Sequence, residues 1–142
     1  MSTISLINGP NLNALGKRPA EVYGSETFEQ IVNKVKTASE KLGLTLDSFQ
    51  SNSEGEIIDY IQSLKSKAII INPGAYSHTS IAIRDALEVV KIPIIEVHIS
   101  NIYKREDFRK HSYVSEVSNS VVCGFGTDGY LIALNAIAKK LA

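Results

Sequence analysis

Polar side chains that could do chemistry follow the apolar runs of this chain, at the point where each run ends. His98 comes directly after the fourth run, Asn8 ends the first, and Asn72 ends the third with His78 just beyond it. Histidine can exchange a proton near neutral pH. In an open parallel sheet, ligands bind beyond the carboxyl ends of the strands. The pattern therefore predicts one shared site with a histidine able to transfer protons.

A long polar segment, residues 8–24, connects the first apolar run to the first helical segment and contains Asn11. Loops of more than about 12 residues in compact domains are usually functional lids or disordered. Gly9 and Gly16 would serve as hinges around Arg18, which such a lid could carry to a ligand. A solvated loop is the alternative interpretation of the same residues.

The residues after the third apolar run allow two interpretations. Pro73 and Gly74 force a turn directly after Asn72. His78 could then cap the following helix or contact a ligand, and the sequence favours neither. Asp85 lies one or two turns into that helix, where an acid is most often solvated.

Apolar runs alternate with segments of helical periodicity along residues 1–142. Thr27 with Gln30 and Ser53 with Glu56 match the capping box, so each pair predicts a helix start. Strands that alternate with helices are typical of an α/β domain with a parallel sheet, and we expect a single domain. The expected strands are 3–8, 44–50, 67–72, 92–97 and 119–124, and helices are expected at 27–42, from Ser53 to about Leu64, at about 78–90 and at about 128–141.

The composition excludes several classes of partner. Fifteen basic residues balance fifteen acidic ones, so the net charge of zero gives no reason to expect binding to nucleic acid or to an anionic membrane. No apolar run approaches the ~20 residues of a membrane helix, and the N-terminus lacks the features of a signal peptide. Cys123 is the single cysteine, so no disulfide can form within the chain. We therefore expect a cytoplasmic protein.

The sequence offers possible cofactor and metal motifs, but the surrounding residues and their spacing do not fit either kind of site. GFGTDG, residues 124–129, matches G-x-G-x-x-G, but no second strand or acidic residue follows at the required distance, so a tight turn explains these glycines better. The three histidines and one cysteine lack the spacing of a metal site. Asn8 and Asn72 stand where a phospho-receiver would carry acidic residues. We expect neither a cofactor nor a metal.

Six blocks of the sequence match a known family in order and spacing: INGPNLNALGKR (7–18), VYG (22–24), QSNSEGE (50–56), INPGAYSHTSIAIRDAL (71–87), IPIIEVHISNIYKREDFRKHSYVS (92–115) and CGFGTDGYLIAL (123–134). Through these blocks the chain resembles type II 3-dehydroquinate dehydratase along nearly its whole length. Three positions depart from the usual family pattern: Pro19 directly follows Arg18, Ser53 stands where histidine is common, and Gly74 stands where alanine is common. None of the three is a catalytic position.

The resemblance implies a fold, an assembly and a reaction. The fold is a flavodoxin-like three-layer sandwich with a five-stranded parallel sheet in the order 2-1-3-4-5. The assembly is a homododecamer, a tetramer of trimers. The reaction converts 3-dehydroquinate to 3-dehydroshikimate plus water, with no cofactor. Whether the enzyme would serve biosynthesis through the shikimate pathway or quinate breakdown stays open.

The resemblance also implies roles for individual residues. Tyr23 is the proton acceptor, His98 the proton donor, and Arg18 stabilises the transition state from a mobile loop. Asn11 and Glu96 match positions that hold a catalytic water and orient the histidine. The implied substrate-binding residues are Asn72, His78, Asp85, Ile99, Ser100 and Arg109.

These roles fit the chemistry of removing a proton next to a ketone, which needs a base, an enolate stabiliser and an acid. Tyrosine is a poor base when neutral, since its ordinary pKa is about 10. One cation at ~4 Å contributes about 4 kcal/mol at an effective dielectric of 20, so Arg18 and Arg109 together could ionise Tyr23. Ser100 and its neighbouring backbone amides could bind the substrate carboxylate.

Two alternatives from other classes are a catalytically silent binding or scaffold protein on the same oligomeric fold, and a flavin-binding module. Arg18, Tyr23 and His98 stand at the family spacing, which favours the enzyme over the scaffold.

Overall fold

The computed structural model describes residues 1–17 and 25–142 and has a parallel five-stranded sheet at its centre. The strand order is β2-β1-β3-β4-β5, as the resemblance implies. The fold is therefore a flavodoxin-like three-layer α/β sandwich, and the predicted fold class is confirmed. The strands are β1 (Ser2–Asn8), β2 (Leu44–Gln50), β3 (Ala68–Asn72), β4 (Ile94–His98) and β5 (Ser120–Cys123).

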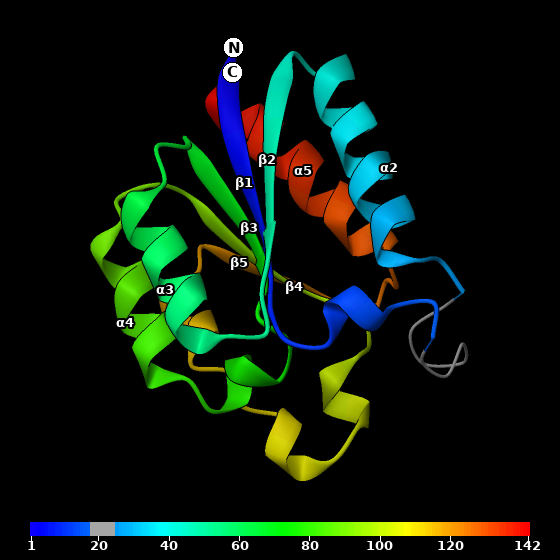
Figure 1. The fold of residues 1–142 in the computed structure, drawn as a ribbon, viewed down its shortest axis with the longest axis vertical. Helices are drawn as coiled ribbons and strands as arrows, with labels where there is room; N and C mark the ends of the chain where they lie inside the picture. The colour runs from blue at the N-terminus through cyan, green and yellow to red at the C-terminus, as the bar shows by residue number, and fades with distance from the viewer. Residues whose placement is uncertain (18–24) are drawn as a thin grey trace.

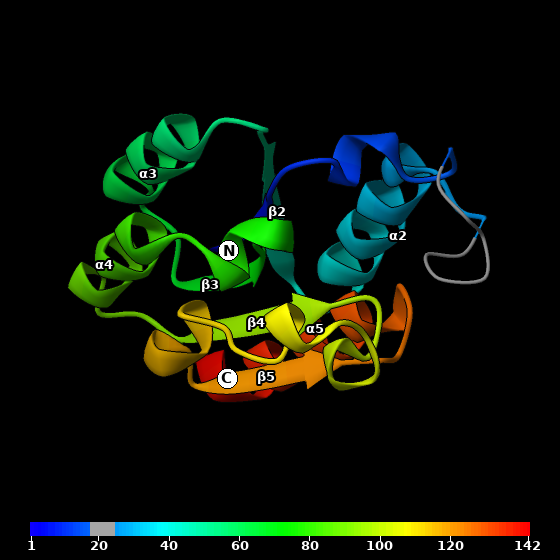
Figure 2. The same cartoon turned by 90° about the horizontal axis from the view of Figure 1, so that it is seen from below.

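Helices cover both faces of the sheet (Figures 1 and 2). One face carries α2 (Phe28–Lys41) and α5 (Asp128–Leu141), and the other carries α3 (Glu54–Ser63) and α4 (Ile81–Val89). Each layer has its own apolar core. The core under α2 and α5 includes Ile4, Leu6, Val35, Ile70, Ile95, Tyr130, Leu134 and Ile137, and the core under α3 and α4 includes Ile7, Ile57, Ile61, Ile69, Ile71, Ile83 and Leu87.

The middle strands are apolar on both sides because both of their faces are covered. Every residue of β3 and of β4 is buried, which explains the continuous run of isoleucines in the sequence. Full burial of one such side chain contributes about 1.5–3 kcal/mol. The sheet is thereby fixed in register, and its polar carboxyl end is held in place by the core.

Of the two predicted capping boxes, one forms completely and the other only in part. The Thr27 side chain accepts a hydrogen bond from the Gln30 backbone N–H at 3.1 Å, and the Gln30 side chain accepts one from the Thr27 N–H at 3.0 Å, so this capping box is confirmed. At α3 only the first half forms: Ser53 accepts from the Glu56 N–H at 3.2 Å, but the Glu56 carboxylate accepts from Ser51 at 2.8 Å instead.

The start of α4 differs from the prediction. Residues Gly74–His78 form a separate 3-10 helix, and α4 begins at Ile81 with Ser80 as its cap. Gly74 adopts a φ of +60°, a conformation that turns the chain after β3. His78 therefore does not cap α4.

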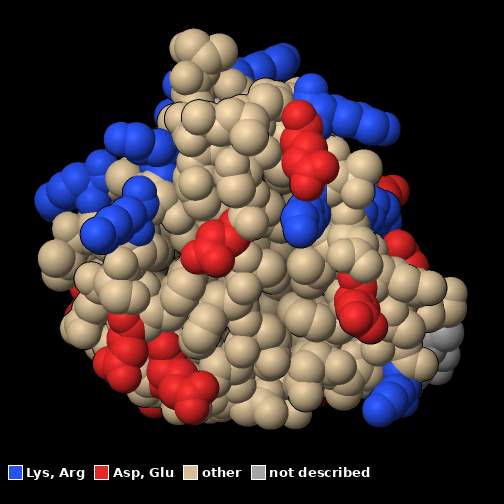
Figure 3. Space-filling model, turned by 45° about the horizontal axis from the view of Figure 1, so that its top comes forward, with Lys and Arg blue, Asp and Glu red and all other residues tan. Residues whose placement is uncertain are grey.

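Both signs of charge occur on the face that Figure 3 shows, in agreement with the net charge of zero. Across residues 1–17 and 25–142, no helix has the length and apolar character needed to span a membrane.

The carboxyl ends of β1 and β3 lie unusually close together. Asn8 pairs with Asn72 in the sheet register, and the Gly9 N–H donates to the Asn72 carbonyl at 2.8 Å. A Cβ atom on Gly9 would lie 2.3 Å from the Pro73 carbonyl oxygen, well inside van der Waals contact. Only glycine fits here without moving the turn after β3.

We predict that Gly9→Ala lowers the free energy of unfolding by roughly 1–3 kcal/mol, as overpacking of a tight site does. Thermal or urea unfolding would measure the change. The matched control is Gly55→Ala in α3, where a Cβ would meet nothing nearer than the Ser53 hydroxyl at 3.9 Å. Alanine there should leave stability unchanged or raise it by up to about 1 kcal/mol. Equal stability of the two variants would contradict the prediction.

Candidate active site

A cavity of about 150 Å³ opens at the carboxyl ends of the strands. Its wall comes from the loop after β1, the turn after β3, the end of β4 and the polar segment that follows β4. This is the end of the sheet at which the sequence predicts a shared site. The lining residues are Pro10, Asn11, Leu12, Asn72, Gly74, Ala75, His78, His98, Ile99, Ser100, Ile102, Arg105 and Arg109.

His98 is paired with a fully buried carboxylate. Residues two apart on a strand point to the same face, so β4 places Glu96 and His98 side by side. The His98 Nε2 atom is hydrogen-bonded to Glu96 Oε2. Ser112 donates to the same oxygen at 2.7 Å, and Ser115 donates to Oε1 at 2.5 Å. Both carboxylate oxygens are thus satisfied without water.

This arrangement keeps Glu96 ionised. Burial alone would raise the pKa of the Glu96 carboxyl, but the hydrogen bonds from His98, Ser115 and Ser112, together with the charge of His98, hold that pKa below its ordinary value. Because Nε2 is hydrogen-bonded to Glu96, Nδ1 is the nitrogen through which His98 can donate a proton to a ligand.

His78 lies beside His98 in a different environment. The two rings are stacked with their centroids 6.3 Å apart, and His78 Nδ1 is hydrogen-bonded to the His111 carbonyl oxygen at 2.8 Å. Burial lowers the pKa of His78, against an opposing effect of the His111 hydrogen bond, and the nearby His98 lowers it further. His78 is therefore neutral near pH 7, with Nδ1–H directed at the carbonyl.

Two asparagines of the cavity wall are held in place by hydrogen bonds. Asn72 Oδ1 accepts from the Gly74 N–H at 3.1 Å, and its Nδ2 donates to the Tyr130 hydroxyl at 2.9 Å. Asn11 adopts a left-handed conformation with a φ of +69°, and its N–H donates to the Asn52 side chain at 3.0 Å. Left-handed backbone suits asparagine better than most residues.

Two arginines bring positive charge to the cavity. Arg109 Nε donates to Glu106 at 3.0 Å, and its guanidinium lies 5.0 Å from the centre of the Phe108 ring. Arg105 Nη1 donates to the Ser100 hydroxyl at 3.2 Å. An anionic ligand would meet both side chains, because both line the cavity.

The structure brings most of the predicted site residues together. Glu96 lies directly behind His98. Asp85 is not among the described residues that line the cavity: its carboxylate is 2.8 Å from Arg84 on α4 and is mostly exposed. Arg18 and Tyr23 lie outside the described residues, so the predicted lid and proton acceptor are not placed. The predicted residues that line the cavity are Asn11, Asn72, His78, His98, Ile99, Ser100 and Arg109.

Sequence reasoning did not assign the residues that support this constellation. Ser112 and Ser115 bond to Glu96 from 16 and 19 residues along the chain, and Arg105 adds a second guanidinium. A signal for the serines was present, because an acid in the middle of a buried apolar strand requires donors. The three-residue spacing of the serines in HSYVS could have been examined for that role.

The glycine-rich motif and the single cysteine both lie within the described residues. Gly124 and Gly126 have φ values of +90° and +61°, which supports a tight turn between β5 and α5 as the interpretation of GFGTDG. Cys123 is a half-buried free thiol. No group of three or more His, Cys, Asp or Glu side chains able to hold a metal ion occurs within 1–17 and 25–142.

Comparison with known proteins gives a consistent result. The family described as dehydroquinase class II matches residues 2–138. The 3-dehydroquinate dehydratase of Buchnera aphidicola subsp. Cinara cedri is 54% identical over 141 residues, covering 97% of this chain and 93% of the relative. That of Enterobacter sp. (strain 638) is 52% identical, covering 98% and 94%. The crystal structure of type II dehydroquinase from Propionibacterium acnes superposes with a TM-score of 0.94 at 40% identity, covering 98% of this chain and 97% of that one. The chain belongs to the class II dehydroquinase family.

Proposed function

We propose that this protein is a type II 3-dehydroquinate dehydratase, a hydro-lyase that converts 3-dehydroquinate to 3-dehydroshikimate plus water in the shikimate pathway. Relatives that bear this name are more than 50% identical over nearly the whole chain, which supports the hydro-lyase assignment. The observation in the molecule that carries the proposal is the buried, ionised Glu96 behind His98 at the wall of the cavity.

The elimination needs a proton donor for the departing hydroxyl, and His98 suits that role. In the charged ring, Nε2–H stays with Glu96 while Nδ1–H is donated to the leaving oxygen. The hydroxyl then leaves as water, and the ring becomes neutral with its remaining proton still held by Glu96. Because the carboxylate is already in place before the reaction, little reorganisation is needed when the proton moves.

The other half of the reaction is an anti elimination through an enolate. Tyr23 would take the proton next to the ketone, and Arg18 would stabilise the charge that develops. Both roles rest on the family resemblance, since both residues lie outside the described chain.

The cavity wall offers groups that suit a carboxylate and several hydroxyls. Arg105 and Arg109 supply charge for the carboxylate of 3-dehydroquinate, together with the Ser100 hydroxyl and the backbone at Ile99. Asn72 and neutral His78 supply hydrogen bonds for hydroxyl groups, and Asn11 would hold a water. The contact of Asp85 with substrate rests on the family resemblance alone, since Asp85 does not line the described cavity.

Residues 1–142 would form a single catalytic domain. The proposed assembly is a homododecamer, a tetramer of trimers, and the proposed location is the cytoplasm. No cofactor or metal takes part in the proposed reaction.

The purified protein is expected to convert 3-dehydroquinate to product without added metal or cofactor. Product formation would be followed by the ultraviolet absorbance of the conjugated enone. Enzyme treated with borohydride in the presence of 3-dehydroquinate, and then freed of both, should be equally active, because the enolate route forms no imine with a lysine that borohydride could reduce. Absence of product from folded protein would contradict the proposed function, and loss of activity after borohydride would contradict the enolate route.

Replacement of His98 by alanine should lower kcat by about 10²–10⁴-fold, the usual contribution of general acid–base catalysis, with a much smaller change in KM. Steady-state kinetics would separate the two constants. The matched control is His111→Ala, whose mostly exposed ring lies 3.5 Å from Glu116 and is not among the described cavity residues. A change in KM alone for His98→Ala would refute the acid role.

The free energy of unfolding should fall at acid pH as Glu96 becomes protonated. Because the pKa of Glu96 is lowered in the folded state, its contribution to stability is fully present above the unfolded pKa of about 4.3 and is lost as the pH falls through the folded value. We expect Glu96→Gln to be less stable than the wild type at pH 7, with the difference shrinking below about pH 4. Urea unfolding of both proteins across pH would test this, since His78 and all other groups are common to both. Parallel pH curves would contradict it.

A further inference from the structure

We infer that Tyr130 is a positioning residue for the reaction, because its hydroxyl holds in place the Nδ2 side of the Asn72 side-chain amide, the side that the Gly74 N–H leaves free. Tyr130 and Asn8, its other hydrogen-bond partner, are not among the described residues that line the cavity. The inference rests on the proposed function to the extent that Asn72 binds substrate. It extends that function to a residue of the last helix.

The hydrogen bonds around Tyr130 have only one possible direction. The Gly74 backbone N–H can only donate, so the Asn72 atom 3.1 Å away must be the oxygen, Oδ1. Asn72 Nδ2 is then the atom facing the Tyr130 hydroxyl, whose oxygen accepts at 2.9 Å. The single phenolic hydrogen is left to donate to Asn8 Oδ1 at 2.6 Å. One backbone N–H thus determines the direction of three successive bonds.

Burial makes this chain of bonds hard to replace. Tyr130 and Asn8 are 0% exposed and Asn72 is 3% exposed, so solvent does not compete for these groups. Burial also raises the pKa of the Tyr130 phenol, against a smaller opposing effect of the Asn72 hydrogen bond. The hydroxyl therefore keeps its proton and remains both an acceptor from Asn72 and a donor to Asn8.

The two ends of the network differ. Asn8 Nδ2 is buried and has no hydrogen-bond partner among the described residues. At the cavity end, both polar atoms of the Asn72 side chain have a partner.

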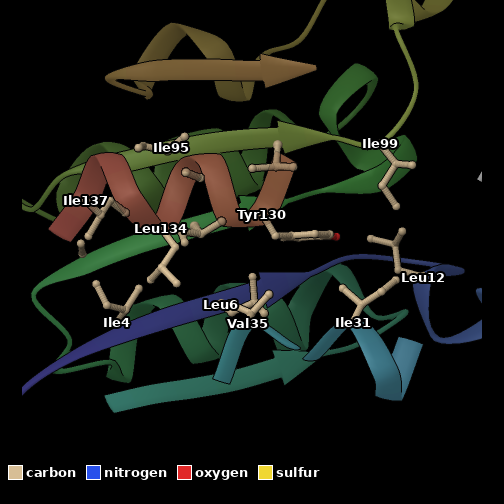
Figure 4. Packing of buried hydrophobic residues seen from close by; sticks show 14 of the residues in the cluster. Ile4, Leu6, Leu12, Ile31, Val35, Ile95, Ile99, Tyr130, Leu134 and Ile137 are labelled. Atoms are coloured by element: carbon tan, nitrogen blue, oxygen red, sulfur yellow. The ribbon is translucent and has the colours of Figure 1, made fainter. Parts of the chain in front are cut away.

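The core brings the hydroxyl to this place. Figure 4 shows the Tyr130 ring among the apolar side chains, with its oxygen pointing the way the strand arrows run, toward the side of Leu12 and Ile99. Both of those residues line the cavity. The preceding Gly129 allows α5 to lie close to β4, since a Cβ there would be 3.2 Å from the Val97 side chain.

The orientation decides what the cavity offers a ligand. Asn72 Oδ1 is occupied by Gly74, and one Nδ2 hydrogen is occupied by Tyr130. The second Nδ2 hydrogen is the donor left for a ligand, so Asn72 would recognise an acceptor oxygen of the substrate. Without the Tyr130 hydroxyl the amide loses the bond that holds this hydrogen in place.

Tyr130→Phe in the full chain should raise KM for 3-dehydroquinate roughly three- to tenfold, the usual effect of one neutral hydrogen bond, and change kcat less than about twofold. The matched control is Tyr60→Phe. Its hydroxyl also bonds two side chains, Asp47 at 2.5 Å and Ser5 at 2.9 Å, but is not among the described cavity groups, so KM should not change. An unchanged KM in folded Tyr130→Phe would overturn the inference.

A double-mutant cycle with Asn72→Ala identifies the route of the effect. If Tyr130 acts through Asn72, then Tyr130→Phe has no further effect on KM in the Asn72→Ala background. Additive effects would overturn the inference. Should Tyr130→Phe fail to fold, Asn8→Ala removes the acceptor at the far end and carries the same test: a raised KM supports the inference, and an unchanged KM overturns it.

The orientation can also be observed without activity. The side-chain amide signals of Asn72 in an ¹⁵N spectrum, assigned with Asn72→Asp, should shift and exchange faster in Tyr130→Phe and remain unchanged in Tyr60→Phe. Unshifted Asn72 signals would overturn the inference. An inactive wild type with shifted signals would instead overturn the proposed function alone, which keeps the two failures distinct.

Discussion

The arrangement of the site depends on a carboxylate that lies in the middle of a buried strand. Glu96 is enclosed in β4 between Ile95 and Val97, and a buried charge costs several kcal/mol unless it is paired and hydrogen-bonded. The compensating groups are His98, from the same strand, and two serine hydroxyls from farther along the chain. The polar segment after β4 must therefore fold back over the carboxyl end of the strand. In doing so it supplies the wall of the cavity, including Arg105 and Arg109.

A second constraint comes from the close approach of β1 and β3. Their carboxyl ends meet at Asn8 and Asn72, and Gly9 lies against the carbonyl of Pro73. The Tyr130 hydroxyl joins the Asn8 and Asn72 side chains from the side of the core, and its ring belongs to the apolar core under α2 and α5 (Figure 4). The same side chain thus contributes apolar packing at one end and hydrogen bonds at the other. The packed core therefore holds this part of the site rigid.

Local patterns predicted most of the fold and part of the site. The strands, the helices and the Thr27 cap follow from apolar runs and spacing, because such features depend on neighbouring residues. The start of α4 and the roles of Ser112 and Tyr130 were missed. So were the short 3-10 helices after β4, at Ile102–Lys104, Asp107–Arg109 and Val114–Val117. These depend on hydrogen bonds between residues such as Asn72 and Tyr130, 58 positions apart, which no local window contains. The strand order came from the family resemblance rather than from any periodicity, and the role that the family implies for Asp85 stays a prediction, since Asp85 does not line the described cavity.

Two neighbouring histidines of the site lie in different environments. His98 and His78 have ring centroids 6.3 Å apart, yet one faces a buried carboxylate and the other a backbone carbonyl. Burial lowers the pKa of His78, and the nearby His98 lowers it further, while His98 Nε2 is hydrogen-bonded to Glu96. Such a difference suits the proposed elimination, because one histidine would donate a proton while the other would hold a substrate hydroxyl as a neutral ring.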